Sequence, residues 1–217
     1  RADQWPVARE QPAVDHVVGR RADGYHLLQT VFRFIDYADV LHFSPGENGN
    51  VILSNPLPGV PPESDLTVRA ARLLQTETGC RQGAEIRVEK RLPMGGGLGG
   101  GSADAAAMLK GLNKFWDLRL TEDELLTIGG KLGSDVPFLL KGGTARGTGR
   151  GEIMEFHESP APHWLLIVKP EISVSTGIAY NKFNGISQFT STTIDHVLSA
   201  LKASDLQRAF TVSGNTF

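Results

Sequence analysis

The sequence predicts an α+β protein in two layers, and three segments carry this prediction. Val31–Phe43 mixes alternation with aromatic and β-branched residues, which is typical of one or two strands with a turn near Asp36–Asp39. Ala84–Arg91 alternates polar and apolar residues, as a strand with one face in water does. Ser102–Phe115 is an alanine-rich stretch that favours a helix.

The remaining elements follow from start and stop signals along the chain. Asp65 is expected to N-cap a helix that runs to about Thr76 and ends at Gly79. Thr121 and Glu124 form a capping box that opens a helix to about Lys131. Further strands are expected at Val51–Leu53 and, of the buried type, at Trp164–Lys169. Further helices are expected at Thr193–Lys202 and Asp205–Phe210, the second opened by a Ser204…Gln207 capping box.

Composition excludes several classes of protein. The 217 residues carry 22 Lys and Arg against 24 Asp and Glu, a net charge of 22 − 24 = −2, which argues against an electrostatic nucleic-acid binder. A single cysteine, Cys80, excludes an intrachain disulfide, and no Cys/His cluster has zinc-ligand spacing. Apolar runs such as Leu165–Val168 are far too short to span a membrane, and no secretory signal opens the chain. We therefore expect no membrane partner and a cytoplasmic location, in a chain without an initiator Met that resembles a fragment.

The segment Pro93–Gly101 is the strongest functional signal. Six of its nine residues are Gly, which are costly to order and are retained where the backbone must approach a ligand or adopt φ > 0. The alanine-rich helix that follows would present unpaired N–H groups and a positive dipole end at the same point. The combination predicts a phosphate-binding loop.

Three other interpretations of the loop are weaker. A Walker A loop needs Lys before Ser102, where this chain has Gly101. Gly95, Gly97 and Gly100 satisfy G-x-G-x-x-G, but any glycine run does, and the preceding strand has one wet face instead of the two buried faces of a Rossmann strand. A flexible linker disagrees with the sharp boundaries set by Pro93 and the helix.

The pattern Pro-x-x-x-Gly-Leu-Gly-x-Gly-Ser-Ala at Pro93–Ala103 resembles the phosphate loop of the galactokinase, homoserine kinase, mevalonate kinase and phosphomevalonate kinase superfamily. This resemblance implies a two-layer kinase fold with a left-handed β-α-β crossover. It also implies an N-terminal ATP and substrate domain, residues 1–159, and a ferredoxin-like C-terminal domain that is partial here, residues 160–217. The Pro-rich stretch Ser159–Pro162 is the expected boundary.

Further blocks narrow the resemblance to the bacterial and plastid kinases of 4-diphosphocytidyl-2-C-methyl-D-erythritol. These blocks are Gly19–Thr30, Phe34–Tyr37, Lys90–Ser102, Leu132–Pro137, Gly149–Glu152 and Lys169–Thr176. The resemblance implies phosphorylation of the substrate 2-hydroxyl in isoprenoid precursor synthesis, with ATP and Mg²⁺ as cofactors. The implied partner is a small cytidine-diphosphate compound, not a nucleic acid, and the implied assembly is a monomer or homodimer.

The same resemblance implies roles for individual residues. Asp135 corresponds to the catalytic base, and Tyr25, His26, Thr176 and Tyr180 correspond to the cytosine site. Lys90 and Asp65 fall where the adenine and ribose pocket is lined. The residues expected to hold the ATP phosphates are Pro93, Met94, Gly95, Gly96, Gly97, Leu98, Gly99, Gly100, Gly101 and Ser102, and the Ser102 hydroxyl could also reach Mg²⁺; no metal site of the protein's own is expected.

Each assignment has a structural alternative. An Asp such as Asp135 in a turn is often a local cap, and a Lys such as Lys90 at a strand end is often only solvated. The side chains of a Tyr–His pair such as Tyr25 and His26 are often half-buried and only pack against their neighbours.

The resemblance fails at the start of the chain. Counting back from Tyr25 places Glu10 where the family has a catalytic Lys and Pro12 where it has an Asn, and the charged, Pro-containing stretch Val7–His16 reads as a poor strand. A Glu beside Asp135 would raise the pKa of one carboxyl and repel the γ-phosphate. Arg9, one position away, is a poor copy of Lys.

Two alternative functions therefore stay open. One is a catalytically impaired nucleotide-binding relic, to which the absence of a late glycine-rich loop also points. The other is a different small-molecule kinase of the superfamily, against which the Tyr25–His26 block argues.

Overall fold

The computed structural model describes residues 3–6, 9–93, 97–162, 164, 166–168 and 192–214. The chain divides into two units, each built on a four-stranded sheet. The first unit comprises Arg1–Glu10, Ile35–Leu92 and Gly99–Gly142, and the second comprises Gln11–Phe34, Pro93–Leu98 and Gly143–Phe217. The expected domains 1–159 and 160–217, and the ferredoxin-like character of the latter, stay predictions.

The sheet of the first unit has the strand order β1-β4-β6-β5. Its centre is the antiparallel pair β4 (Val40–Gly46) and β6 (Gly83–Glu89), with β1 (Asp3–Pro6) antiparallel to β4 and β5 (Val51–Leu53) parallel to β6. Leu41, Phe43 and Ile86 alternate along the central strands and are fully buried. This alternation confirms the one-sided strands that the sequence predicts.

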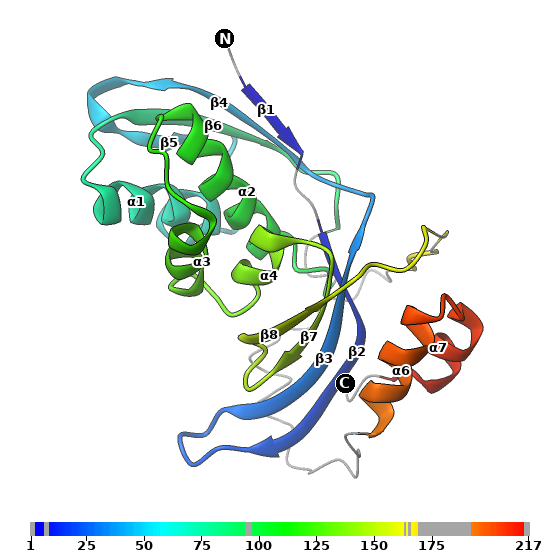
Figure 1. Ribbon diagram of the computed structural model, residues 1–217. Helices are drawn as coiled ribbons and strands as arrows, with labels where there is room; N and C mark the ends of the chain where they lie inside the picture. The colour runs from blue at the N-terminus through cyan, green and yellow to red at the C-terminus, as the bar shows by residue number, and fades with distance from the viewer. Residues whose placement is uncertain are drawn as a thin grey trace. The chain divides into compact units, whose positions relative to one another are not determined.

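Four helices lie on the same side of this sheet, as Figure 1 shows, two of them against the strands and two against the other helices. They are α1 (Leu66–Thr78), α2 (Gly100–Phe115), α3 (Glu122–Gly130) and α4 (Val136–Lys141). Two 3₁₀ turns, Glu47–Gly49 and Pro62–Ser64, join the elements. Helix α2 is central, and its small residues Ala103 and Ala105–Ala107 are buried against its neighbours. The expected α+β arrangement in two layers is confirmed.

The capping signals set the helix ends as predicted. The Asp65 side chain accepts a hydrogen bond from the Thr67 amide at the start of α1, and Gly79 ends the helix in the left-handed conformation. At α3, Thr121 and Glu124 make both hydrogen bonds of the capping box. Local side-chain chemistry therefore determines these boundaries.

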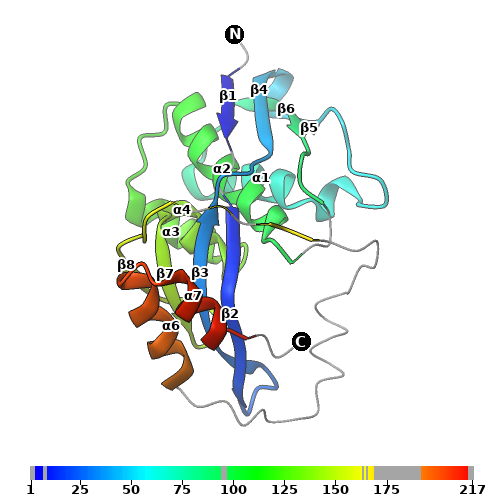
Figure 2. The same cartoon turned by 90° about the vertical axis from the view of Figure 1, so that its right-hand side faces the viewer.

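The sheet of the second unit has the order β2-β3-β7-β8. Its strands are β2 (Arg9–Arg20), β3 (His26–Ile35), β7 (Thr144–Thr148) and β8 (Ile153–His157), with β3–β7 and β7–β8 antiparallel. Helices α6 (Thr192–Lys202) and α7 (Leu206–Val212) lie against this sheet in Figures 1 and 2. Their buried residues, among them Ile194, Val197 and Leu201, form one cluster with Val31 of β3.

The prediction that Val7–His16 is a poor strand is wrong. Arg9–Arg20 forms the 12-residue strand β2, in which Glu10 and Pro12 both lie. Among the described strands β2 occupies the edge of its sheet. Proline is tolerated there because an edge strand leaves half of its backbone groups outside the ladder.

Two further predictions are corrected. In the expected strand Trp164–Lys169, the described residues 164 and 166–168 are not in a strand, and the Trp164 side chain is fully exposed. A short apolar run cannot by itself supply the partner strand that a ladder requires. The Ser204…Gln207 capping box is also absent, because the N-cap of α7 is Asp205, whose side chain accepts from the Arg208 amide.

No helix within the described ranges combines the length and the apolar composition that crossing a bilayer requires.

Candidate active site

Two glycines near the end of the glycine-rich segment have a left-handed backbone conformation. Gly97 has φ +67°, and Gly99, the N-cap of α2, has φ +62°. Residues with a Cβ rarely adopt this conformation, so glycine is needed at both positions. At Gly101 the backbone is not left-handed, but a Cβ there would lie 3.3 Å from Leu66 Cδ1, so the leucine side chain would have to shift slightly. Met94, Gly95 and Gly96 lie outside the described residues.

The start of α2 is not capped by a side chain. Gly99 offers no side-chain oxygen, and the first turn contains no acidic residue. The first N–H groups of an α-helix have no intrahelical acceptor, so the amides of Gly100, Gly101 and Ser102 have none within α2. Such a helix start is suited to an anion.

Lys90, just after β6, lies between two buried carboxylates. Its Nζ is 2.6 Å from Asp39 Oδ2 and 2.7 Å from Asp104 Oδ2. Asp39 is completely buried and precedes β4, while Asp104 is 3% exposed and belongs to the second turn of α2. Burial raises the pKa of Asp104 to about 7, against the opposing effect of the Lys90 ammonium and with a further contribution from Asp39. Burial lowers the pKa of Lys90, but Asp104 and Asp39 outweigh it, so the net shift is upward and Lys90 stays charged.

Asp65 has its carboxylate engaged at the start of α1. Its Oδ1 accepts hydrogen bonds from both the amide and the hydroxyl of Thr67, and its side chain is buried. The residue is therefore a helix cap in this structure. Its expected contact with ATP stays a prediction.

Asp135 stands at the start of α4 without capping it. Its backbone is helical, its side chain makes no cap hydrogen bond, and Ser134 Oγ donates to its Oδ1 at 3.1 Å. Burial raises the pKa of the Asp135 carboxyl, and the hydrogen bond from Ser134 opposes that shift in part. A carboxylate with a raised pKa is a stronger base at neutral pH. The local-cap alternative therefore does not describe this side chain.

Tyr25 belongs to the tight turn between β2 and β3 in the second unit. Its ring is 57% exposed, and the guanidinium carbon of Arg150 lies 5.1 Å from the ring centroid. Its amide donates to Asp23 Oδ1, and Arg150 in turn pairs with Glu152. An exposed aromatic face is suited to stacking on a base or a cation. His26 is the first residue of β3 and is half-buried.

The other predicted residues are placed only in part. Ser102 is the third residue of α2 and is partly buried, and Leu98 is buried. Glu10 lies in β2, which the structure describes by its backbone. Thr176 and Tyr180 lie outside the described residues.

Sequence reasoning missed three residues around these positions. Asp39 and Asp104 surround Lys90, and Arg150 covers one face of Tyr25. The available signal was Asp104 itself, a lone carboxylate in the alanine-rich segment 102–107. A charged residue on the buried face of a helix requires a partner.

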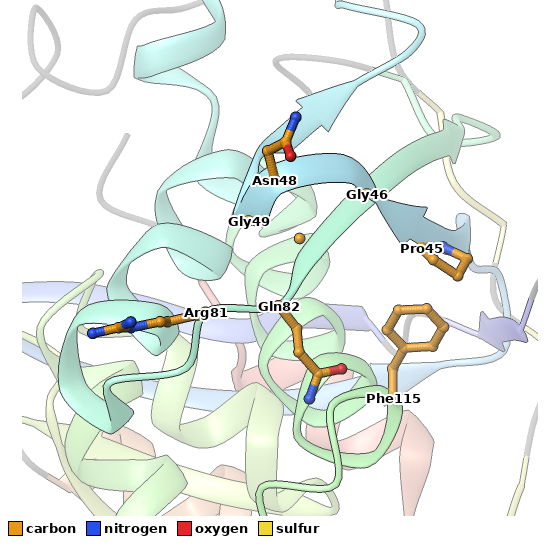
Figure 3. Close-up of a pocket in the computed structure, with 8 residues that line it drawn as sticks. Pro45, Gly46, Asn48, Gly49, Arg81, Gln82 and Phe115 are labelled. Carbon is orange, nitrogen blue, oxygen red and sulfur yellow. The ribbon is translucent and has the colours of Figure 1, made fainter.

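A surface hollow of about 710 Å³ lies elsewhere in the first unit (Figure 3). Its lining includes Pro45, Arg81, Gln82 and Phe115, and it contains none of the residues predicted for nucleotide or substrate. In the part of the chain that the structure describes, no three His, Cys, Asp or Glu side chains are grouped closely enough to hold a metal ion.

Comparison with known proteins finds relatives that match most of the chain. The family described as GHMP kinases N terminal domain matches residues 65–143, which include the glycine-rich segment, α2 and Asp135. A relative from Chromobacterium violaceum, named 4-diphosphocytidyl-2-C-methyl-D-erythritol kinase, is 52% identical over 181 residues, covering 83% of this chain and 63% of the relative. A relative of the same name from Dechloromonas aromatica is 52% identical over 176 residues, covering 81% of this chain and 64% of the relative. The chain thus spans less than two thirds of the length of these relatives.

Solved structures show the same relationship. A crystal structure titled 4-(cytidine 5'-diphospho)-2C-methyl-D-erythritol kinase superposes with a TM-score of 0.77 at 29% identity, covering 93% of this chain and 72% of that one. A homoserine kinase from Cytophaga hutchinsonii, at 17% identity and a TM-score of 0.65, shares the fold, and the two chains overlap over 99% of this one and 72% of the other. Residues 65–143 therefore match the N-terminal domain of the GHMP kinases, and most of the chain is similar to relatives named 4-diphosphocytidyl-2-C-methyl-D-erythritol kinase.

Proposed function

We propose that this chain is a small-molecule kinase that transfers the γ-phosphoryl group of ATP to the 2-hydroxyl of 4-diphosphocytidyl-2-C-methyl-D-erythritol. The observation that carries the proposal is the glycine-rich segment leading, through left-handed Gly99, into the uncapped start of α2. The names of the relatives supply the substrate.

Phosphoryl transfer needs positioning and charge stabilisation more than covalent chemistry from the protein. The backbone N–H groups at the start of α2 would hold the phosphates, and Ser102 would add its hydroxyl. Mg²⁺ bound with the nucleotide would neutralise part of its charge, and the Ser102 hydroxyl in the first turn of α2 could hold it.

Asp135 has the properties of the base. The substrate hydroxyl oxygen forms a bond to the γ-phosphorus, the bond from that phosphorus to the β-γ bridging oxygen breaks, and ADP leaves. The hydroxyl proton passes to Asp135, whose raised pKa favours accepting it.

Tyr25 and His26 would recognise the cytosine. The exposed ring of Tyr25 provides a stacking surface, and the imidazole of His26 can form a hydrogen bond to the polar edge of the base. Thr176 and Tyr180 are expected to complete that site.

The alternative function, an impaired nucleotide-binding relic, is favoured by Glu10. This residue stands in β2 where the family resemblance expects the catalytic Lys. A carboxylate there would oppose both ionised Asp135 and the γ-phosphate.

An assay that couples ADP release to a colour change tests the proposal with ATP, Mg²⁺ and the cytidine-linked substrate. Asp135→Asn is expected to lower kcat by about 10²- to 10⁴-fold, since it removes the base, while nucleotide affinity is unchanged. Asp123→Asn, which alters an exposed carboxylate in α3, serves as the matched control. Normal turnover by Asp135→Asn would remove the assignment of the base.

The same assay separates the two functions. A wild-type chain that binds ATP without turnover, and gains turnover in Glu10→Lys, would favour the relic. A wild-type chain that turns over, with no gain from Glu10→Lys, would exclude it.

A further inference from the structure

The Asp39–Lys90–Asp104 cluster joins the two ends of the glycine-rich segment. Lys90 precedes Pro93–Gly101 in the chain, and Asp104 follows it, yet Lys90 Nζ is 2.7 Å from Asp104 Oδ2. The loop between them contains six glycines, so the entropy cost of ordering it is high. A fixed contact across its base reduces that cost by holding the two ends together.

Asp39 fixes the chain that leads into the segment. Its Oδ2 receives Lys90 Nζ at 2.6 Å, and its Oδ1 accepts from the amides of Arg91 at 2.7 Å and Leu92 at 3.0 Å. One completely buried carboxylate thus holds three consecutive residues. Tyr37 adds a hydrogen bond from its hydroxyl to the Arg91 carbonyl at 2.8 Å.

Asp104 fixes the chain that leaves the segment. It is the fifth residue of α2, and its carboxylate is 5% exposed where it meets Lys90. A Cβ on Gly100 would lie 3.8 Å from Lys90 Nζ, so the ammonium also packs against the first turn of α2. Desolvation offsets much of the attraction within a buried ion pair, so such a pair is weak evidence for stability, and its position between the two ends of the segment matters more here.

We propose that Asp39, Lys90 and Asp104 form a clasp that positions the glycine-rich segment for the nucleotide, with Lys90 as a positioning residue and not an adenine or ribose contact. The proposal rests on the proposed function for its nucleotide, but the clasp itself is a property of the free protein. Preorganising a loop in this way increases affinity by lowering the ordering cost of binding.

The clasp predicts a specific pattern of nucleotide affinities. Asp104→Ala removes the acceptor of the 2.7 Å ion pair, and Lys90→Met removes the cation while keeping a chain of similar length. Each is expected to weaken binding of ATP with Mg²⁺ by about tenfold, the effect of losing one charge-assisted hydrogen bond. The double variant is expected to bind no more weakly than Lys90→Met, because both changes open the same contact.

Two variants provide matched comparisons. Asp104→Asn keeps an oxygen that can accept from Lys90, and is expected to stay within about twofold of wild type. Lys131→Met breaks an exposed ion pair of equal length, 2.7 Å to Glu77, and is expected to leave affinity unchanged. In a turning-over enzyme the clasp variants are expected to raise the KM for ATP and leave kcat within about threefold, since no clasp residue touches the reacting atoms.

Direct contact between Lys90 and the phosphates gives a different pattern. Lys90→Met would then weaken binding, but Asp104→Ala would leave it unchanged or strengthen it by removing a negative charge. That result, or additive losses in the double variant, would overturn the clasp.

Amide hydrogen exchange without nucleotide provides the second readout. Lys90→Met is expected to speed exchange at Gly97–Ala103 at least threefold relative to wild type and to Lys131→Met. Unchanged exchange would overturn the clasp even if Asp104→Ala fails to fold. If Lys90→Met shows this faster exchange but the wild-type protein binds no ATP, the proposed function is refuted and the clasp stays in place.

Discussion

At the scale of residues, the contacts of charged side chains in the structure differ from those that the sequence leads one to expect. Lys90 is expected from the sequence to line a nucleotide pocket, but the structure surrounds its ammonium with Asp39 and Asp104. Asp65, expected near the same pocket, caps α1. Asp135, by contrast, does not cap α4 with its side chain, and its Oδ1 accepts a hydrogen bond from Ser134 Oγ.

Asp104 predicts a pH dependence of stability. Its pKa is about 7 in the folded protein against 3.8 ordinarily, so the folded state binds the proton more tightly than the unfolded state. Its contribution to the free energy of unfolding is therefore largest below about pH 4 and is lost as the pH rises to about 7. Asp104→Asn, which stays neutral, is expected to flatten this part of the profile, as measured by urea unfolding between pH 4 and 8. A variant profile parallel to that of wild type would contradict the raised pKa.

Tyr25→Ala tests the expected cytosine site. Loss of a stacking surface is expected to weaken binding of the cytidine-linked substrate by about 1–3 kcal/mol and to leave ATP affinity unchanged, as measured by calorimetric titration of each ligand. Phe210→Ala removes an aromatic ring of equal exposure, 57%, in α7 and serves as the control. Equal losses for both ligands would assign Tyr25 a structural role.

At the scale of elements, close approach between helices depends on single glycines. A Cβ on Gly129 of α3 would lie 2.7 Å from Leu140 Cδ1 and 2.9 Å from Val136 Cγ1 of α4. A Cβ on the next residue, Gly130, would lie 4.0 Å from Pro137 Cγ, an ordinary contact distance. In the contact between α3 and α4, a side chain at Gly129 therefore requires α4 residues to shift, whereas a side chain at Gly130 does not.

Gly129→Ala is accordingly expected to lower the free energy of unfolding by about 1–3 kcal/mol through overpacking. Gly130→Ala is expected to be neutral or slightly stabilising, since alanine favours a helix. Chemical denaturation of the two variants checks this. Equal effects would show that α3 and α4 can separate at little cost.

At the scale of the whole molecule, sequence-distant segments build each unit. The core of the second unit joins Val31 of β3 to Ile194, Val197 and Leu198 of α6, more than 160 residues later in the chain. No local pattern near Val31 indicates that a helix from the end of the chain will cover it. The burial of Val31 is decided by the tertiary structure.

Ile194→Ala tests that contact. The side chain is completely buried, so its truncation is expected to cost about 2–5 kcal/mol of unfolding free energy. His196→Ala, on the exposed side of α6, is expected to change stability by less than about 0.5 kcal/mol. Thermal unfolding of both proteins provides the comparison, and a small loss for Ile194→Ala would mean that α6 is not part of the cooperative core.

Much of the fold was predictable because its signals are local. The Asp65 cap, the Thr121–Glu124 capping box and the alternation in 84–91 each depend on residues within a few positions of one another. The predictions that failed concern the pairing of strands into a sheet. Strand β2 forms despite Pro12 because it pairs with β3 at the edge of the sheet, where proline is tolerated. The described residues of the apolar run at 164–168 are not in a strand.

The sequence by itself determined the resemblance to the GHMP kinases, the left-handed glycines at the end of the glycine-rich segment and the helix that follows it, because these depend on consecutive residues and on backbone conformations that few residue types adopt. Only the tertiary structure decided that Lys90 meets Asp39 and Asp104, and that Arg150 lies over Tyr25. Ion pairs and ring contacts depend on distances between atoms that the chain brings together after 14, 51 or 125 residues, and such distances are set by packing and not by spacing along the sequence.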